Sequence, residues 1–167
     1  MKVPLYKQSK MTCGPACLKM VLAYFNKNIS EKEIIKEIGG IKKYGVRMIK
    51  LADLARKLNF KVECLSYNKK LAQGKAKIKE PNKADILKYL RKNIPVILAV
   101  NSRILSNKQN KNPKLGHFIV ITKYQNKNFW YNNPQDGKQH KIKEDELLFA
   151  WHNNILNSSG YFLAIWQ

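Results

Sequence analysis

The sequence predicts an α+β fold in which helices come first and an antiparallel sheet follows. Up to Phe60, apolar residues recur at helical spacing in three segments. Beyond it, short apolar or alternating runs are separated by turn residues, a pattern typical of strands. Helices and strands segregated along the chain in this way indicate the α+β class.

Length and composition favour one folded domain over residues 1–167. A chain of this length can bury roughly 70% of the surface of its extended form. Hydrophobic residues make up 44% of the sequence, with 3 Trp, 8 Tyr and 6 Phe. This supply of apolar side chains indicates a packed core rather than disorder.

Three helices are expected in the first third of the chain. The first begins at Cys13 and runs to about Asn26. Ser30-Glu31-Lys32-Glu33 is a capping-box pattern that starts a short second helix, and Gly39-Gly40 ends it. The third spans residues 48–58, where apolar side chains fall on one face.

Strands dominate the rest of the chain. The expected strands are 60–65, 95–100, 116–121, 129–131 and 160–166, with a brief pairing at 139–142 and a short edge strand at 3–6. Further helices are expected at 84–91 and 144–151, whereas the Lys-rich segment 69–83 and the segment 101–115 are expected to be loops.

Cys13 is a candidate nucleophile because it stands at the N-terminus of the first expected helix. Pro15 is tolerated in the first turn, where its missing N–H would be unpaired anyway. The free N–H groups and the helix dipole favour an anion there, so a lowered thiol pKa is expected. Gln8, five residues upstream, could donate an amide hydrogen bond beside the sulfur. These are the parts of an acyl-transfer site.

A purely structural role is the alternative for each cysteine, because a cysteine on a helix is more often a small buried hydrophobe than a nucleophile. Cys17 and Cys64 fit that role, since each lies within an apolar periodic pattern. Cys13 differs because it precedes the body of the helix and is followed by Gly-Pro.

His117 is the candidate base, although a lone histidine opening an apolar strand is more often structural. Residues 123–128 read as the turn into the next strand, which ends at Asn133-Pro134. Such a hairpin would bring His117 beside Asn133, whose amide oxygen can accept from one imidazole nitrogen so that the other faces the thiol. Asp136 is the nearest carboxylate and the alternative orienting residue.

These residues together resemble the bacteriocin-processing cysteine peptidases. The resemblance rests on Gln8, the run from Thr12 to Leu18, Gly116-His117-Phe118 and the Asn133-Pro134 turn, and it covers nearly the whole chain in order. Members of that family are papain-like domains that cut peptides after a double-glycine leader, and many are fused to peptide-exporting ABC transporters.

The resemblance implies a papain-like fold, a peptide substrate and a catalytic role for four residues. Cys13 would be the nucleophile, His117 the general base, Gln8 the oxyanion donor and Asn133 the orienting residue. The family usually has Asp where this chain has Asn133, but papain-like enzymes use Asn in that role. A separately encoded transporter would be the partner, since no stretch approaches the roughly 18 apolar residues of a membrane span.

No cofactor or metal ion is expected, because His117, His140 and His152 show no paired ligand spacing. Three cysteines, an odd number without metal-binding spacing, indicate reduced thiols and a reducing compartment. The first residues lack the apolar core of a signal peptide, so a cytoplasmic location is expected.

The charge of +21, from 32 Lys and Arg against 11 Asp and Glu, bears on partners rather than on the fold. It would attract acidic leader peptides or nucleic acid. A basic nucleic-acid-binding module is one alternative function, although no expected helix concentrates basic residues on one face with aromatic residues between them. A catalytically inactive peptide-binding relative is another, and the presence of Cys13 argues against it.

Overall fold

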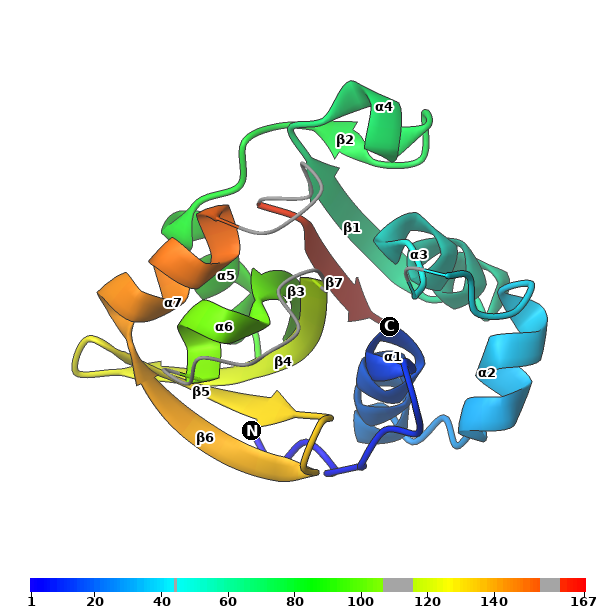
Figure 1. Cartoon of the computed structure of the whole chain (residues 1–167), viewed down its shortest axis with the longest axis horizontal. Coiled ribbons are helices and arrows are strands. Elements are labelled where there is room, and N and C mark those ends of the chain that lie inside the picture. The colour runs from blue at the N-terminus through cyan, green and yellow to red at the C-terminus, as the bar shows by residue number, and fades with distance from the viewer. Residues whose placement is uncertain (44, 107–115, 154–159) are drawn as a thin grey trace.

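The computed structural model describes residues 1–43, 45–106, 116–153 and 160–167. In this part of the chain a seven-stranded sheet has the strand order β2-β1-β7-β3-β4-β5-β6. Every neighbouring pair is antiparallel except β1 and β2, which are parallel. Helices α1 to α3 lie on one side of the curved sheet, and α5 to α7 lie on the other (Figure 1). The α+β prediction, with N-terminal helices packed on a mainly antiparallel sheet, is confirmed.

The bounds of the elements follow the predicted order. The helices are α1 (Cys13–Tyr24), α2 (Glu31–Glu37), α3 (Met48–Lys57), α4 (Lys69–Ala72), α5 (Lys83–Leu90), α6 (Ser102–Ser106) and α7 (Glu144–His152). The strands are β1 (Lys61–Ser66), β2 (Lys77–Ile78), β3 (Val96–Asn101), β4 (Gly116–Gln125), β5 (Asn128–Asn133), β6 (Lys138–Lys143) and β7 (Phe162–Trp166). Among the helices of the described residues, none combines the length and the apolar character needed to cross a membrane.

The ends of α2 follow the predicted signals. Ser30 Oγ accepts a hydrogen bond from the Glu33 N–H at 3.1 Å, which caps the start of the helix. At the other end Gly39 and Gly40 have φ values of +81° and +82°, and the Gly40 N–H donates to the Ile35 carbonyl at 2.8 Å. Only glycine adopts these angles without strain, so the pair terminates the helix.

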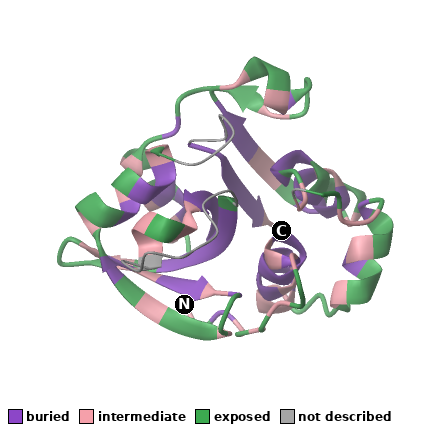
Figure 2. Cartoon of the chain, viewed as in Figure 1, coloured by how far each residue is buried: buried purple, intermediate pink, exposed green. Residues whose placement is uncertain are grey.

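The sheet separates two apolar cores, because side chains of a strand alternate between its faces. One core packs α1, α2 and α3 against one face, and its sheet residues include Ile97, Phe118, Val120, Leu163 and Ile165. The other packs α5 and α7 against the opposite face, and its sheet residues include Leu98, Ile119, Ile121, Phe129 and Phe162. Figure 2 shows the central strands as buried and the outward faces of the helices as exposed.

The hairpin between β4 and β5 is longer than predicted. Its turn consists of Asn126 and Lys127, whose φ values are +49° and +55°, as in the tight turns that match the twist of two paired strands. The expected turn at 123–128 is therefore wrong at both ends, because residues 123–125 pair with 128–130. The longer ladder runs from the turn back to the pair of Val120 and Asn132, with one register shift between Ile121 and Lys123.

Three other expectations are wrong. Residues 3–6 form no strand, although the Val3 carbonyl accepts from Asn132 Nδ2 at 3.2 Å. The expected loop 69–83 contains α4, capped by Asn68, and β2, which pairs with the end of β1. The expected loop 101–115 begins with α6, and 107–115 lie outside the described residues.

Gly14 of α1 packs tightly against neighbouring side chains, and this packing leads to a stability prediction. A Cβ on Gly14 would overlap Val46 Cγ1 and lie 3.3 Å from Phe118 Cδ2. We expect Gly14→Ala to lower the free energy of unfolding by about 1–3 kcal/mol, the usual effect of overpacking, as measured by urea denaturation. Lys36→Ala, on the exposed face of α2, should change it by less than about 0.5 kcal/mol. Equal stability of Gly14→Ala and the wild type would contradict this packing.

Candidate active site

Cys13 is the first residue of α1, and its side chain is partly exposed. The backbone N–H groups of Cys13 and Gly14 face the sulfur from the first turn of the helix, and the N–H of Phe118 faces it from β4. The first N–H groups of a helix have no partner within the helix, so they are free to stabilise a thiolate. Because Phe118 follows His117 in the chain, this contact holds the sulfur at the start of β4, where His117 lies.

Burial sets the protonation state of the thiol. It raises the pKa of Cys13 above its ordinary value, and the three backbone N–H groups offset only part of that effect. The expectation of a lowered pKa is therefore wrong for this structure. The reason is tertiary, because the first turn of α1 packs against Leu51 and Phe118. Cys17 and Cys64 are buried, as expected, and burial raises the pKa of Cys64 to about 12.

His117 is bound to Asn133 by a short hydrogen bond. The distance from His117 Nε2 to Asn133 Oδ1 is 2.8 Å, and the Gln135 N–H donates to the same oxygen at 3.0 Å. An amide oxygen only accepts, so Nε2 carries the proton and Nδ1 has the free lone pair. Burial lowers the pKa of His117, while the Asn133 bond and the charge of Asp136 act in the opposite direction. The imidazole is therefore neutral at pH 7.

Asp136 does not replace Asn133 as the hydrogen-bond partner. Its Oδ1 accepts from the Lys138 N–H at 3.0 Å, and its Oδ2 accepts from His140 Nε2 at 2.8 Å. Burial acts to raise the pKa of Asp136, but these bonds and the nearby His140 outweigh it, so the carboxyl pKa is lowered. Asp136 is therefore a carboxylate at neutral pH and acts on His117 through its charge.

Gln8 is tied to the same turn as Asn133. Its backbone N–H donates to the Pro134 carbonyl at 2.7 Å, and Gly137 of this turn packs closely on Lys7. The side-chain oxygen of Gln8 is buried and has no hydrogen-bond partner among the described residues. A buried unpaired polar atom costs about 1–3 kcal/mol, so its presence calls for an explanation beyond packing.

Glu31 holds the loop between Gln8 and Cys13, a role that the sequence did not indicate. Its carboxylate accepts from Thr12 Oγ1 at 2.8 Å and from the Ser9 N–H at 3.4 Å. Glu31 is the first residue of α2 and lies 19 residues from Thr12. In the sequence Glu31 is recognisable only as part of the capping pattern of α2, and nothing in that pattern indicates its contacts with Thr12 and Ser9.

Three contacts thus assemble four residues from distant parts of the chain. Gln8 is bound to the turn after β5, Asn133 of that turn is bound to His117, and the residue after His117 contacts the Cys13 sulfur. A thiol, a neutral imidazole with a free nitrogen and a side-chain amide are the groups that acyl transfer requires. No group of three or more His, Cys, Asp or Glu in the described part of the chain could hold a metal ion.

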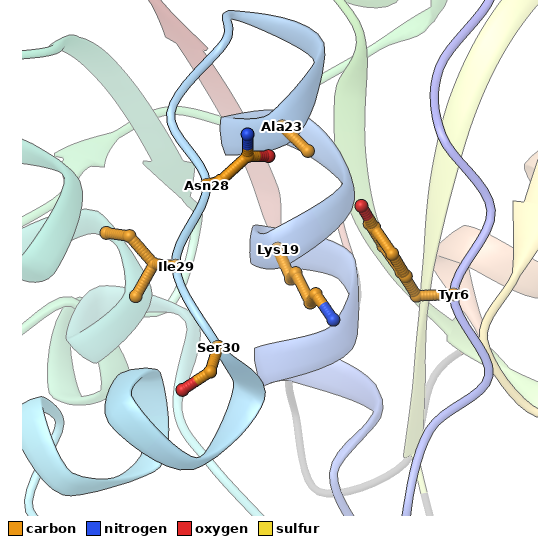
Figure 3. A pocket seen from close by; sticks show the side chains of 6 residues that line it. All are labelled: Tyr6, Lys19, Ala23, Asn28, Ile29 and Ser30. Atoms are coloured by element: carbon orange, nitrogen blue, oxygen red, sulfur yellow. The ribbon is translucent and has the colours of Figure 1, made fainter.

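A separate pocket lies beside α1, as Figure 3 shows. It has a volume of about 250 Å³ and is lined by Tyr6, Lys19, Ala23, Asn28, Ile29 and Ser30. The ammonium of Lys19 lies 3.9 Å from the centroid of the Tyr6 ring. The pocket contains none of the four candidate residues.

Solved structures of peptidase domains share this fold. The peptidase domain of Streptococcus ComA, a bifunctional ABC transporter, has a TM-score of 0.70 and 18% identity over 98% of each chain. A putative C39-like peptidase from Bacillus anthracis has a TM-score of 0.72 and 16% identity, over 99% of this chain and 95% of that one. A double-glycine-motif protease from an AMS/PCAT transporter, solved with a leader peptide, has a TM-score of 0.63 and 22% identity, over 99% of this chain and 91% of that one.

The family assignment comes from the sequence itself. A search of curated proteins finds no match to this chain. The profile of the family described as Peptidase C39-like matches residues 1–155, which include all four candidate site residues. This chain therefore belongs to the Peptidase C39-like family.

Proposed function

We propose that this chain is a cysteine peptidase, working as one papain-like domain over residues 1–167. The observation that supports it most is the pair of contacts at the start of β4. His117 donates from Nε2 to Asn133, which leaves Nδ1 free, and the adjacent Phe118 N–H faces the Cys13 sulfur. A histidine with a free ring nitrogen, adjacent in the chain to a residue whose N–H contacts a thiol at a helix N-terminus, supplies the base and the nucleophile of cysteine catalysis.

The proposed reaction is acyl transfer. His117 Nδ1 accepts the thiol proton as the sulfur of Cys13 attacks the peptide carbonyl carbon. The oxyanion accepts hydrogen bonds from the Gln8 side-chain amide and the Cys13 N–H. The imidazolium then donates its proton to the leaving amine, and a water molecule activated by His117 hydrolyses the thioester. Because burial disfavours both the thiolate and the imidazolium, the proton moves during attack and not before substrate binds.

The proposed substrate is a peptide with small residues before the cleaved bond. The solved AMS/PCAT relative is a double-glycine-motif protease in complex with a leader peptide, and family membership makes a leader of this type the natural candidate here. A net charge of +21 favours binding of an acidic leader. We further propose a separately encoded peptide-exporting transporter as the partner and the cytoplasm as the site of action.

The first prediction from this function concerns thiol reactivity. With the native protein at neutral pH, iodoacetamide should alkylate Cys13 before Cys17 and Cys64, because Cys13 is partly exposed and has a neighbouring base, whereas the other two are buried. Mass spectrometry of tryptic peptides gives the order. His117→Gln should slow the labelling of Cys13 and leave the other two unchanged. Equal labelling of all three cysteines would contradict the proposal.

The second prediction separates a functional from a structural role of Gln8. Gln8→Ala should lower kcat about 100- to 1000-fold, the usual effect of removing one oxyanion donor. It should not lower the urea midpoint, because its buried side-chain oxygen makes no hydrogen bond. Gln135→Ala, an exposed residue of the neighbouring turn, is the control and should change neither quantity. A normal kcat for Gln8→Ala would show that Gln8 is not the oxyanion donor.

The third prediction concerns specificity. Peptides with Gly-Gly before the cut should be cleaved with a kcat/KM about 10- to 200-fold above the same peptides with Leu-Leu, because a cleft that accepts two glycines would exclude larger side chains. Raising the salt concentration should weaken the binding of acidic leaders by screening and leave the preference for glycine in place. If profiling with a peptide library showed a preference for bulky or basic residues before the cleaved bond, the double-glycine specificity would be excluded. The chain would then be a peptidase of another specificity.

A further inference from the structure

The turn between β5 and β6 holds a second hydrogen-bonded pair next to Asn133. His140 Nε2 donates to Asp136 Oδ2 at 2.8 Å, and the Lys138 N–H donates to Asp136 Oδ1 at 3.0 Å. Both carboxylate oxygens are therefore engaged, which fixes the orientation of the group. The His140 ring stacks on Tyr131, with 5.4 Å between centroids and 25° between planes.

The strand register places the side chain of His140 on the same face of the sheet as that of His117. Ile121 is the partner of Tyr131, and Tyr131 is the partner of His140. Since side chains alternate along each strand, His117, Tyr131, Asn133 and His140 belong to one face. The His140 ring therefore lies on the same face as the hydrogen bond from His117 to Asn133.

Asn133 orients His117 but carries no charge, whereas Asp136 carries one. Burial lowers the pKa of His117, and the negative charge of Asp136 acts against that shift. The other titratable groups around the turn and His117 include Cys13 of α1, His140 and Lys138 of β6, and Lys7 of the N-terminal segment. Tyr131 of β5 is another, and burial together with the charge of Asp136 raises its pKa to about 12. The Gly137 N–H donates to the Asn133 carbonyl at 2.9 Å, and this turn keeps Asp136 close to Asn133, the hydrogen-bond partner of His117.

We propose that Asp136, held in place by His140, is a positioning residue that supplies the negative charge supporting the His117 imidazolium, while Asn133 fixes the direction of the ring. In this chain the orienting bond and the supporting charge are divided between two residues of one turn. The catalytic benefit rests on the proposed peptidase function, but the effect on the protonation of His117 does not.

The direct test measures the titration of His117 by NMR of protein labelled with 13C-histidine. In Asp136→Asn, which keeps an acceptor for the Lys138 N–H, His117 should titrate at lower pH than in the wild type. Asp145→Asn removes the same charge from the exposed start of α7 and should leave the titration of His117 unchanged. Because the Asp136 side chain is 39% exposed, the difference between Asp136→Asn and the wild type should shrink at high salt.

A kinetic measurement then separates a positioning role from a structural one. Asp136→Asn should lower kcat several-fold with little change in KM, and the acid limb of the pH profile should move to lower pH together with the NMR titration. Adding Asn133→Asp to Asp136→Asn should restore kcat, because a charge returns next to the imidazole. His140→Phe retains a ring to stack on Tyr131. It should move the titration of His117 to lower pH, but by less than Asp136→Asn does.

The outcomes distinguish this inference from the proposed function. An unchanged titration of His117 in Asp136→Asn, or an equal shift in Asp145→Asn, would overturn the role of Asp136. A lowered titration in Asp136→Asn, in a protein that cleaves no peptide in any form, would support the charge effect and overturn the peptidase proposal instead. Failure of Asn133→Asp to restore kcat would also overturn the role of Asp136 in catalysis.

Discussion

The hydrogen bond from His117 Nε2 to Asn133 Oδ1 is the constraint on which the rest of the site depends. It fixes the tautomer, and so it decides that Nδ1 is the basic nitrogen. The bond exists because β4 and β5 pair as a hairpin, in which the two-residue turn and a register shift between Ile121 and Lys123 together bring into contact two residues 16 positions apart. Pro134, the next residue, binds the backbone of Gln8. One hairpin therefore positions the proposed base, its orienting residue and the segment that carries the proposed amide donor.

Burial gives the site a neutral resting state. Taking charged groups out of water disfavours both the thiolate of Cys13 and the imidazolium of His117, and the surrounding N–H groups and the Asp136 charge compensate only in part. Such a pair differs from a preformed ion pair, in which the thiol and the imidazole would both be charged in the resting protein.

Local patterns predicted the parts of the site that depend on neighbours in the sequence. The Gly-Pro pair after Cys13 indicated the start of α1, and the spacing of two apolar runs indicated that His117 meets Asn133. Long-range packing decided the rest. The raised pKa of Cys13 depends on side chains from α3 and β4, and the bond between Glu31 and Thr12 joins residues with no shared motif. Helix α4 and strand β2 were missed because a lysine-rich segment resembles a loop until it pairs with β1.

The central claim is that Cys13 forms a covalent thioester during turnover. The most direct measurement mixes the protein with a peptide carrying Gly-Gly before the cut, quenches the reaction in acid within one turnover, and weighs the intact protein and its fragments. The account predicts a mass increase equal to the N-terminal part of the substrate, located on Cys13 and absent from Cys13→Ala. Peptide cleavage that persists in Cys13→Ala, or an adduct on another residue, would contradict it.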